Sequence, residues 1–243
     1  MCQFCSSGTI AGRHSRRGVV GMLAATAGYA LLRPALAAEP AAPPKPQNVV
    51  SPERALHLLM AGNERYVAGV ARRHDFKHER EALTAGQNPY AAILGCADSR
   101  VAPEYAFDAG RGDLFVCRVA GNFANDDVVA SLEYAVGVLN TPLIMVLGHD
   151  ACGAVGAALT SLADNTTLPG HLPSLVAGLA PAVRASDGMP GDRLRNAIRQ
   201  NVILTVARLK AAAPTIAPLV DQKKLRIVGG VYGLADGHVA LVA

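Results

Sequence analysis

From residue 90 onward, short apolar runs alternate with longer amphipathic stretches. The apolar runs have the length and the polar flanking residues of buried strands, and the amphipathic stretches carry apolar residues at helical spacing. The predicted strands are residues 90–95, 114–119, 143–147, 225–231 and 238–242, and the predicted helices are residues 126–139, 151–162 and 194–209. Apolar strands separated by helices are typical of a parallel sheet covered on both faces. The pattern predicts an α/β fold with a central, mainly parallel β-sheet flanked by helices.

A further helix is predicted ahead of the first strand. Ser51 can cap it, Pro52 suits its first turn, and Glu53 lies near the positive end of its dipole. Apolar residues at helical spacing carry the prediction to about residue 67. This segment would form an N-terminal helical arm.

Two stretches predict connections rather than regular elements. Residues 69–89 are polar, and their histidines, His74 and His78, are interpreted as part of a solvated connection rather than as metal ligands. Residues 163–192 contain many Pro and Gly residues and predict a loop with a short helix.

The first 37 residues have the features of an export signal. Arg16 and Arg17 precede an apolar run over residues 18–32, and residues 35–37 (Ala-Leu-Ala) form a small-x-small cleavage site. Paired arginines indicate the twin-arginine route of bacteria, which predicts a periplasmic protein without stable membrane association after cleavage. The alternative is an uncleaved membrane anchor.

The remainder of the chain divides into a linker at residues 38–50, rich in Ala and Pro, and one domain at residues 51–243. The chain has 243 residues, of which 51% are hydrophobic, enough for a sizeable core. Its net charge of +4 comes from four arginines in residues 1–37, because later residues carry 19 basic and 19 acidic side chains. The domain therefore has no excess of positive charge, and nucleic acid is not an expected partner.

The residues with the clearest chemistry form two motifs: Cys96-Ala-Asp98-Ser-Arg100, and His149-Asp-Ala-Cys152-Gly153. Each motif follows a predicted strand, and ligand sites gather at the carboxyl ends of strands in open α/β sheets. Two thiolates and one imidazole are zinc ligands, and three protein ligands with an open fourth position are typical of catalytic zinc. Zinc with an open position can lower the pKa of bound water to about 7, which makes hydroxide available. Two thiolates donate more charge than two imidazoles and should leave the bound water less acidic unless neighbouring groups compensate.

Asp98 and Arg100 lie two and four residues after Cys96. An arginine can bind a carboxylate through two hydrogen bonds and keep it ionised, and a fixed carboxylate can orient zinc-bound hydroxide. Without Arg100, Asp98 could become a fourth zinc ligand and close the site. A purely structural zinc would instead require four permanent protein ligands. Cys117, the remaining cysteine after residues 1–37, is predicted to be buried in its strand. The three cysteines beyond residue 37 are few and odd in number, which argues against a disulfide scaffold.

The resemblance of the chain to the β-class carbonic anhydrases of bacteria extends beyond the two metal motifs, over about residues 51–243. The matching segments are residues 96–101 (CADSRV), 112–116 (GDLFV), 118–122 (RVAGN), 131–135 (SLEYA) and 148–154 (GHDACGA). The resemblance implies one zinc per subunit held by Cys96, His149 and Cys152, with Asp98 and Arg100 as a catalytic pair. It also implies a homodimer or dimer-based tetramer whose active sites lie at the subunit interface.

The substrate pocket is likewise implied by the resemblance. Gln87 matches a glutamine that hydrogen-bonds substrate, and Phe115 and Tyr134 match an apolar wall for carbon dioxide, shared between subunits. Gly153 matches a glycine whose backbone N–H meets bicarbonate. The chain has no Trp, so the regulatory bicarbonate pocket that contains Trp in some members is absent in its usual form. This favours an Asp98–Arg100 pair that stays formed.

The expected activity is reversible hydration of carbon dioxide to bicarbonate and a proton, a lyase reaction. Two alternatives stay open. A related zinc hydrolase of carbon disulfide-like substrates could use the same residues, and a non-catalytic zinc-binding protein could hold the metal with four permanent ligands.

Overall fold

The computed structural model describes residues 50–243. The predicted export signal and all of the predicted linker except Val50 therefore lie outside the described residues. No helix within 50–243 combines the length and the apolar character that a membrane span requires.

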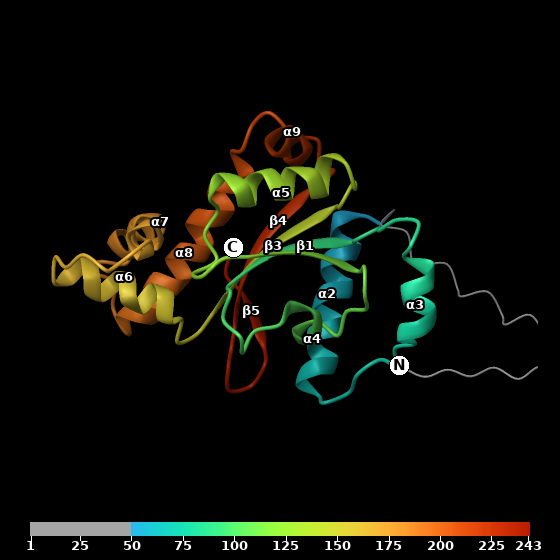
Figure 1. Cartoon of the computed structure of the whole chain (residues 1–243), viewed down its shortest axis with the longest axis horizontal. Helices are drawn as coiled ribbons and strands as arrows, with labels where there is room; N and C mark the ends of the chain where they lie inside the picture. The colour runs from blue at the N-terminus through green and yellow to red at the C-terminus, as the bar shows by residue number, and fades with distance from the viewer. Residues whose placement is uncertain (1–49) are drawn as a thin grey trace, which may run out of the picture. The chain divides into compact units, whose positions relative to one another are not determined.

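A five-stranded sheet in the order β2-β1-β3-β4-β5 forms the centre of the fold (Figure 1). The strands are β1 (Ala91–Gly95), β2 (Leu114–Arg118), β3 (Leu143–His149), β4 (Arg226–Tyr232) and β5 (Val239–Leu241). All neighbours are parallel except β4 and β5, which are antiparallel. The predicted α/β class with a mainly parallel sheet is confirmed.

Helices cover both faces of this sheet and extend past the carboxyl ends of its strands (Figure 1). They are α2 (Pro52–Val67), α3 (Phe76–Ala82), α4 (Pro103–Ala106), α5 (Asp126–Gly137), α6 (Gly153–Ala163), α7 (Leu172–Ala185), α8 (Arg193–Lys210) and α9 (Ile216–Asp221). Alternate residues of a strand point to opposite faces. Ile93 accordingly packs with α2 and α4, whereas Leu94 packs with α5, α8 and α9.

The N-terminal helix α2 belongs to the core rather than standing apart from it. Ser51 caps it as predicted, and Leu59 on its inner face is fully buried. The Asn63 amide donates to the carbonyls of Ala106 and Gly237 over 2.9 and 2.8 Å, and its oxygen accepts from the Val239 N–H. These bonds attach α2 to α4 and to the turn between β4 and β5. By contrast, α3 buries none of its residues.

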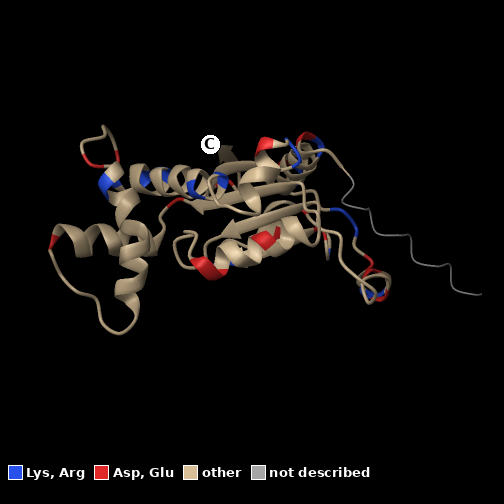
Figure 2. Ribbon diagram, turned by 90° about the horizontal axis from the view of Figure 1, so that it is seen from above, with Lys and Arg blue, Asp and Glu red and all other residues tan. Residues whose placement is uncertain are grey.

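Helix α8 lies unusually close to the sheet. A Cβ atom placed at Gly148 of β3 would lie 2.7 Å from Val202 of α8, and one at Gly229 of β4 would lie 2.5 Å from the same side chain. Only glycine leaves room for this approach, so α8 packs directly against the backbone of β3 and β4. The Lys and Arg residues of α8 are all exposed, and β1 and β3 contain no Lys, Arg, Asp or Glu. In Figure 2 the charged residues lie mainly on the helices and connections.

The two predicted connections were wrong in part. Residues 163–192 contain the 14-residue helix α7, whose Leu179 and Val183 are buried against α6 and α8. Pro181 lies inside this helix, so packing outweighs the local preference that suggested a loop. Residues 69–89 contain α3, which Asp75 caps, and the short helices α4 and α9 were also missed. Neither α4 nor α9 is long enough for a clear helical period.

Candidate metal centre

Three predicted ligands meet at one end of the sheet. Cys96 directly follows β1, His149 ends β3, and Cys152 is the N-terminal cap of α6. Because β1 and β3 are parallel neighbours, with Gly95 opposite Leu147, their carboxyl ends lie side by side. The ligand atoms of these three residues all lie within 4.8 Å of one another. The exposed fractions of the residues are only 4%, 0% and 1%.

The orientation of His149 fits a metal ion. Its Nδ1 lies 2.8 Å from the carbonyl oxygen of Asp150 and donates to it, which leaves Nε2 as the nitrogen with a free lone pair. Nε2 is buried and has no hydrogen-bond partner among residues 50–243. Such an unpaired buried nitrogen is costly in a protein without metal. Together with two thiols it forms the donor set of zinc, so the residues fit the group that the sequence predicts.

The two thiols are electrostatically coupled. A hydrogen bond from the Cys152 thiol lowers the pKa of Cys96 below its usual value, against the opposing effect of burial. The same interaction raises the pKa of Cys152, because its proton is shared with the Cys96 thiolate. Zinc requires both sulfurs to be deprotonated, so metal binding releases the protons that the two thiols still hold.

Asp98 and Arg100 form the predicted pair beside the ligands. Arg100 donates from Nε to Oδ1 over 2.9 Å and from Nη2 to Oδ2 over 2.7 Å, and its backbone N–H donates to Oδ1. The hydrogen bonds from the Arg100 side chain hold the pKa of Asp98 well below its usual range. Oδ2 of Asp98 lies 3.8 Å from Nε2 of His149. The carboxylate thus lies at the metal centre and is bound to Arg100 rather than included in the three-ligand cluster.

Sequence reasoning assigned no role to Arg118, which supports the loop that carries these groups. Its Nε donates to the carbonyl of Cys96 over 2.8 Å, and Nη2 donates to the carbonyl of Asp98 over 2.6 Å. Arg118 ends β2, whose neighbour is β1, so it can reach the backbone that leaves β1. The signal in the sequence that could have indicated this role is a charged residue at the end of an apolar strand.

Comparisons with known proteins agree with this geometry. Residues 91–239 match the family model described as "Carbonic anhydrase". The chain is 45% identical over 194 residues to "Carbonic anhydrase 2" of Mycobacterium tuberculosis, an alignment that covers 79% of this chain and 93% of that protein. It is 42% identical to "Carbonic anhydrase" of Mycolicibacterium smegmatis, with the same coverage of each chain.

Similarity to solved structures identifies the class of carbonic anhydrase. The β-carbonic anhydrase CcaA superimposes with a TM-score of 0.63 at 28% identity, covering 78% of this chain and 86% of that one. The chain belongs to the β-class carbonic anhydrases. A β-carbonic anhydrase from Sordaria macrospora, at 24% identity and a TM-score of 0.62, covers 78% of this chain and 98% of its own, and supports the fold. The predicted family and the zinc cofactor are confirmed.

One chain does not bring all the predicted β-carbonic anhydrase pocket residues to the metal. Phe115 and Tyr134 lie together, with ring centroids 6.3 Å apart, but Phe115 pairs with Ala92 near the start of β1. Gln87 is exposed and precedes β1, whereas Cys96 follows it. A strand rises about 3.3 Å per residue, so these residues lie toward the opposite end of β1 from the metal centre. Gly153, in contrast, begins α6 beside Cys152 and is exposed.

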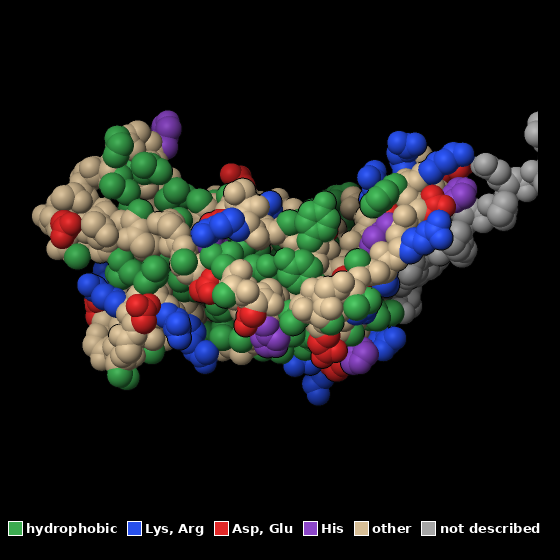
Figure 3. Space-filling view, turned by 90° about the horizontal axis from the view of Figure 1, so that it is seen from below, with side chains coloured by type: hydrophobic (Ala, Val, Ile, Leu, Met, Phe, Trp, Pro, Cys, Tyr) green, Lys and Arg blue, Asp and Glu red, His purple; other side chains and the backbone are tan. Residues whose placement is uncertain are grey.

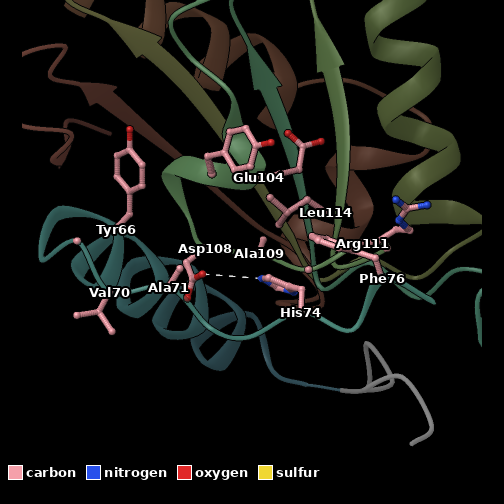
Figure 4. Close-up of a pocket in the computed structure, with 14 residues that line it drawn as sticks. Tyr66, Val70, Ala71, His74, Phe76, Glu104, Asp108, Ala109, Arg111 and Leu114 are labelled. Atoms are coloured by element: carbon pink, nitrogen blue, oxygen red, sulfur yellow. Dashed lines mark ion pairs between the residues drawn. The ribbon is translucent and has the colours of Figure 1, made fainter. Parts of the chain in front are cut away.

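The large cavity of this β-carbonic anhydrase lies elsewhere. It has a volume of about 770 Å³ and is lined by residues from two stretches, 66–76 and 104–114, none of them a metal ligand (Figure 4). Its walls include Tyr66, Val70 and Leu114, and His74 faces Asp108 across 3.9 Å. Asp108 is already bound by Arg65, and Nδ1 of His74 by Glu79. The cavity is therefore mainly an apolar hollow beside the edge strand β2.

We expect replacement of Cys152 by serine to abolish stoichiometric zinc binding. Changes to groups that merely contact ligands cost about 10–100-fold in affinity, so loss of a thiolate ligand should cost at least as much. Zinc per chain, measured by elemental analysis after dialysis, should fall far below one in Cys152→Ser. The matched control is Cys117→Ser, since Cys117 is half-buried in β2 and outside the cluster. Zinc loss in the control, or retention in Cys152→Ser, would contradict the ligand assignment.

Proposed function

We propose that this chain catalyses the reversible hydration of carbon dioxide at the Cys96–His149–Cys152 centre. The observation that carries the proposal is the Asp98 carboxylate beside the buried ligands, ionised and fixed by two side-chain hydrogen bonds from Arg100. A structural zinc site needs no such pair. The relatives named carbonic anhydrase, at 45% and 42% identity over most of the chain, support the same reaction.

Each residue has a distinct role in the proposed reaction. Zinc bound to the three ligands would supply activation of water at neutral pH. Asp98 accepts a hydrogen bond from the attacking water and orients it, while Arg100 keeps the carboxylate ionised and turned toward His149. Arg118 fixes the backbone of Cys96 and Asp98. Backbone N–H groups at the start of α6, beside Gly153, favour an anionic product such as bicarbonate.

The complete pocket, we infer, is shared between two copies of the chain. β2 is the outer strand of the sheet on one side, and within residues 50–243 no further strand pairs with its outer edge. Its Leu114, Phe115 and Val116 are half-buried. An exposed apolar edge is a site for pairing with another chain. Across a two-fold axis, the amino end of one β2 strand lies near the carboxyl end of the other. Phe115 and Tyr134 of one copy could then reach the metal centre of the second.

Exposed apolar side chains near this edge support an interface between copies. Tyr134 is 47% exposed, and Tyr105, Phe76 and Val70, which line the large cavity, are 76%, 64% and 59% exposed. Apolar side chains also reach the surface between charged ones on the face shown in Figure 3. Large exposed apolar patches mark interaction sites. We propose a homodimer, alone or as the unit of a dimer-based tetramer, as the minimal active unit.

The proposal extends to the location of the protein. The paired arginines, the apolar run and the small-residue site of residues 1–37 support export by the twin-arginine route and cleavage after Ala37. The linker would then separate the cleaved end from α2.

The prediction for the catalytic pair uses a change that preserves shape. Asp98→Asn removes the negative charge and one of the two oxygens that accept hydrogen bonds from Arg100. Carbon dioxide hydration should therefore fall by about 10–100-fold. Zinc content should stay at one per chain. Stopped-flow hydration, with zinc measured on the same sample, tests both. Asp126→Asn, which breaks an exposed pair with Arg208, should keep full activity. An Asp98→Asn protein as active as wild type would refute the role.

Carbon disulfide turnover by the wild-type protein that exceeds its carbon dioxide turnover would favour the alternative function, a zinc hydrolase of carbon disulfide-like substrates.

Complementation tests the shared pocket. Cys152→Ser lacks a ligand and Phe115→Ala lacks part of the wall, so each protein alone should have low activity. A mixed dimer brings the intact metal centre of one chain to the intact wall of the other, and restores one of its two sites. Co-expression should therefore raise activity well above the sum of the separate proteins. No gain from a mixture shown to contain mixed dimers would mean that each pocket lies within one chain.

Export predicts a mature protein that begins after Ala37. Mass spectrometry of protein from the periplasmic fraction should find the cleaved form there, and Arg16→Lys with Arg17→Lys should leave uncleaved protein in the cytoplasm. Full-length protein in the membrane fraction would instead support the anchor.

A further inference from the structure

The turn that follows β2 contacts a zinc ligand from outside the ligand set. The backbone N–H of Gly121 donates to Sγ of Cys96, with 3.3 Å between nitrogen and sulfur. Gly121 and Asn122 both have positive φ values, 84° and 41°. A Cβ atom at Gly121 would lie 2.9 Å from the side chain of Leu179. Position 121 therefore requires glycine, both for its positive φ and for the space beside Leu179. This backbone conformation directs the Gly121 N–H toward the sulfur.

Asn201 holds the other peptide group of Gly121. Its Nδ2 donates to the Gly121 carbonyl over 2.7 Å, although the two residues are 80 positions apart in the chain. Asn201 is 3% exposed on the inner face of α8. A buried carbonyl without a partner costs free energy, so this bond stabilises the turn in one conformation. Gly121 is thus fixed from both sides, by the Cys96 sulfur and by Asn201.

Helix α8 also has a fixed position relative to His149. Val202, next to Asn201, packs on Gly148, where a Cβ atom would lie only 2.7 Å from its side chain. His149 follows Gly148 at the end of β3. Helix α8 therefore contacts two segments that hold metal ligands. Val202 packs against the strand that ends in His149, and Asn201 binds the turn that contacts Cys96.

We propose that Asn201 is a positioning residue for the zinc centre, which acts through the Gly121 N–H on the Cys96 thiolate. A hydrogen bond to a ligating sulfur stabilises the thiolate and reduces its electron donation to the metal, and such outer contacts tune metal affinity. Without the amide of Asn201, the turn at Gly121 loses its support and the N–H no longer stays aligned with the sulfur. This inference rests on the zinc site of the proposed function.

The test compares two buried polar residues on α8. Asn201→Leu keeps the size of the side chain and removes the donor. Thr205→Val removes a buried hydroxyl one turn later on the same face, where Thr205 is 5% exposed and, within residues 50–243, makes no side-chain hydrogen bond to the Gly121 turn. Zinc affinity is measured by chelator competition. The sulfur-to-metal charge-transfer band is measured on the cobalt-substituted proteins.

Asn201→Leu should weaken zinc binding by about tenfold, because the turn that positions the Cys96 sulfur loses its support. It should also shift the charge-transfer band to longer wavelength, because a sulfur without the Gly121 hydrogen bond donates more electron density to the metal. Thr205→Val should change neither value, even where thermal unfolding shows that it lowers stability. Wild-type affinity and band position in folded Asn201→Leu would overturn the proposal. Equal changes in both variants would also overturn it, since they would report general loosening of α8.

A measurement on the wild-type chain covers the case in which Asn201→Leu fails to fold. In protein loaded with ¹¹³Cd, a hydrogen bond from an N–H to a ligating sulfur transmits a scalar coupling between the metal and the amide proton. A coupling at the Gly121 amide is expected, and its absence in protein with one cadmium per chain would overturn the inference. Failure of the proposed function would look different, because wild-type protein would then lack hydration activity whatever the state of this hydrogen bond.

Discussion

The parallel pairing of β1 with β3 is the constraint on which the metal centre depends. Parallel neighbours end at the same edge of the sheet, so Cys96 and His149, 53 residues apart in the chain, meet without any long loop. The glycine before His149 lets α8 pack against the backbone of β3. Cys152, the N-terminal cap of α6, follows His149 by three residues and adds the third ligand near the same strand end. The fold thus positions three buried ligands from two strand ends.

Buried sulfur and nitrogen ligands need support from outside the cluster, and backbone groups provide most of it. The Asp150 carbonyl fixes the ring of His149, and the Gly121 N–H contacts the Cys96 sulfur. Arg118 uses its charge to hold two backbone carbonyls, whereas Arg100 uses its charge to hold a carboxylate. Arg118 thus fixes the loop, and Arg100 fixes the ionised carboxylate that the chemistry requires.

The sequence predicted well what depends on local pattern and on short motifs. The central strands, the start of α2 at Ser51 and the three ligands follow from apolar runs, capping residues and donor types. Helix α7 is longer than the short helix predicted within residues 163–192, because its Pro and Gly residues oppose helix formation locally and packing against α6 and α8 decides the outcome. The contacts of Arg118 and Asn201 were missed for a related reason. They join residues that are 20 or 80 positions apart, and no local pattern encodes such contacts.

The position of the pocket wall follows from the same parallel sheet. Placing all ligands at the carboxyl edge leaves Phe115 and Gln87 toward the amino end, so a single chain holds the metal residues and the wall at different ends of β1 and β2. A two-fold pairing of β2 edges would remove this separation and also cover an exposed apolar strand edge. Association would then be a condition of catalysis and not only of stability.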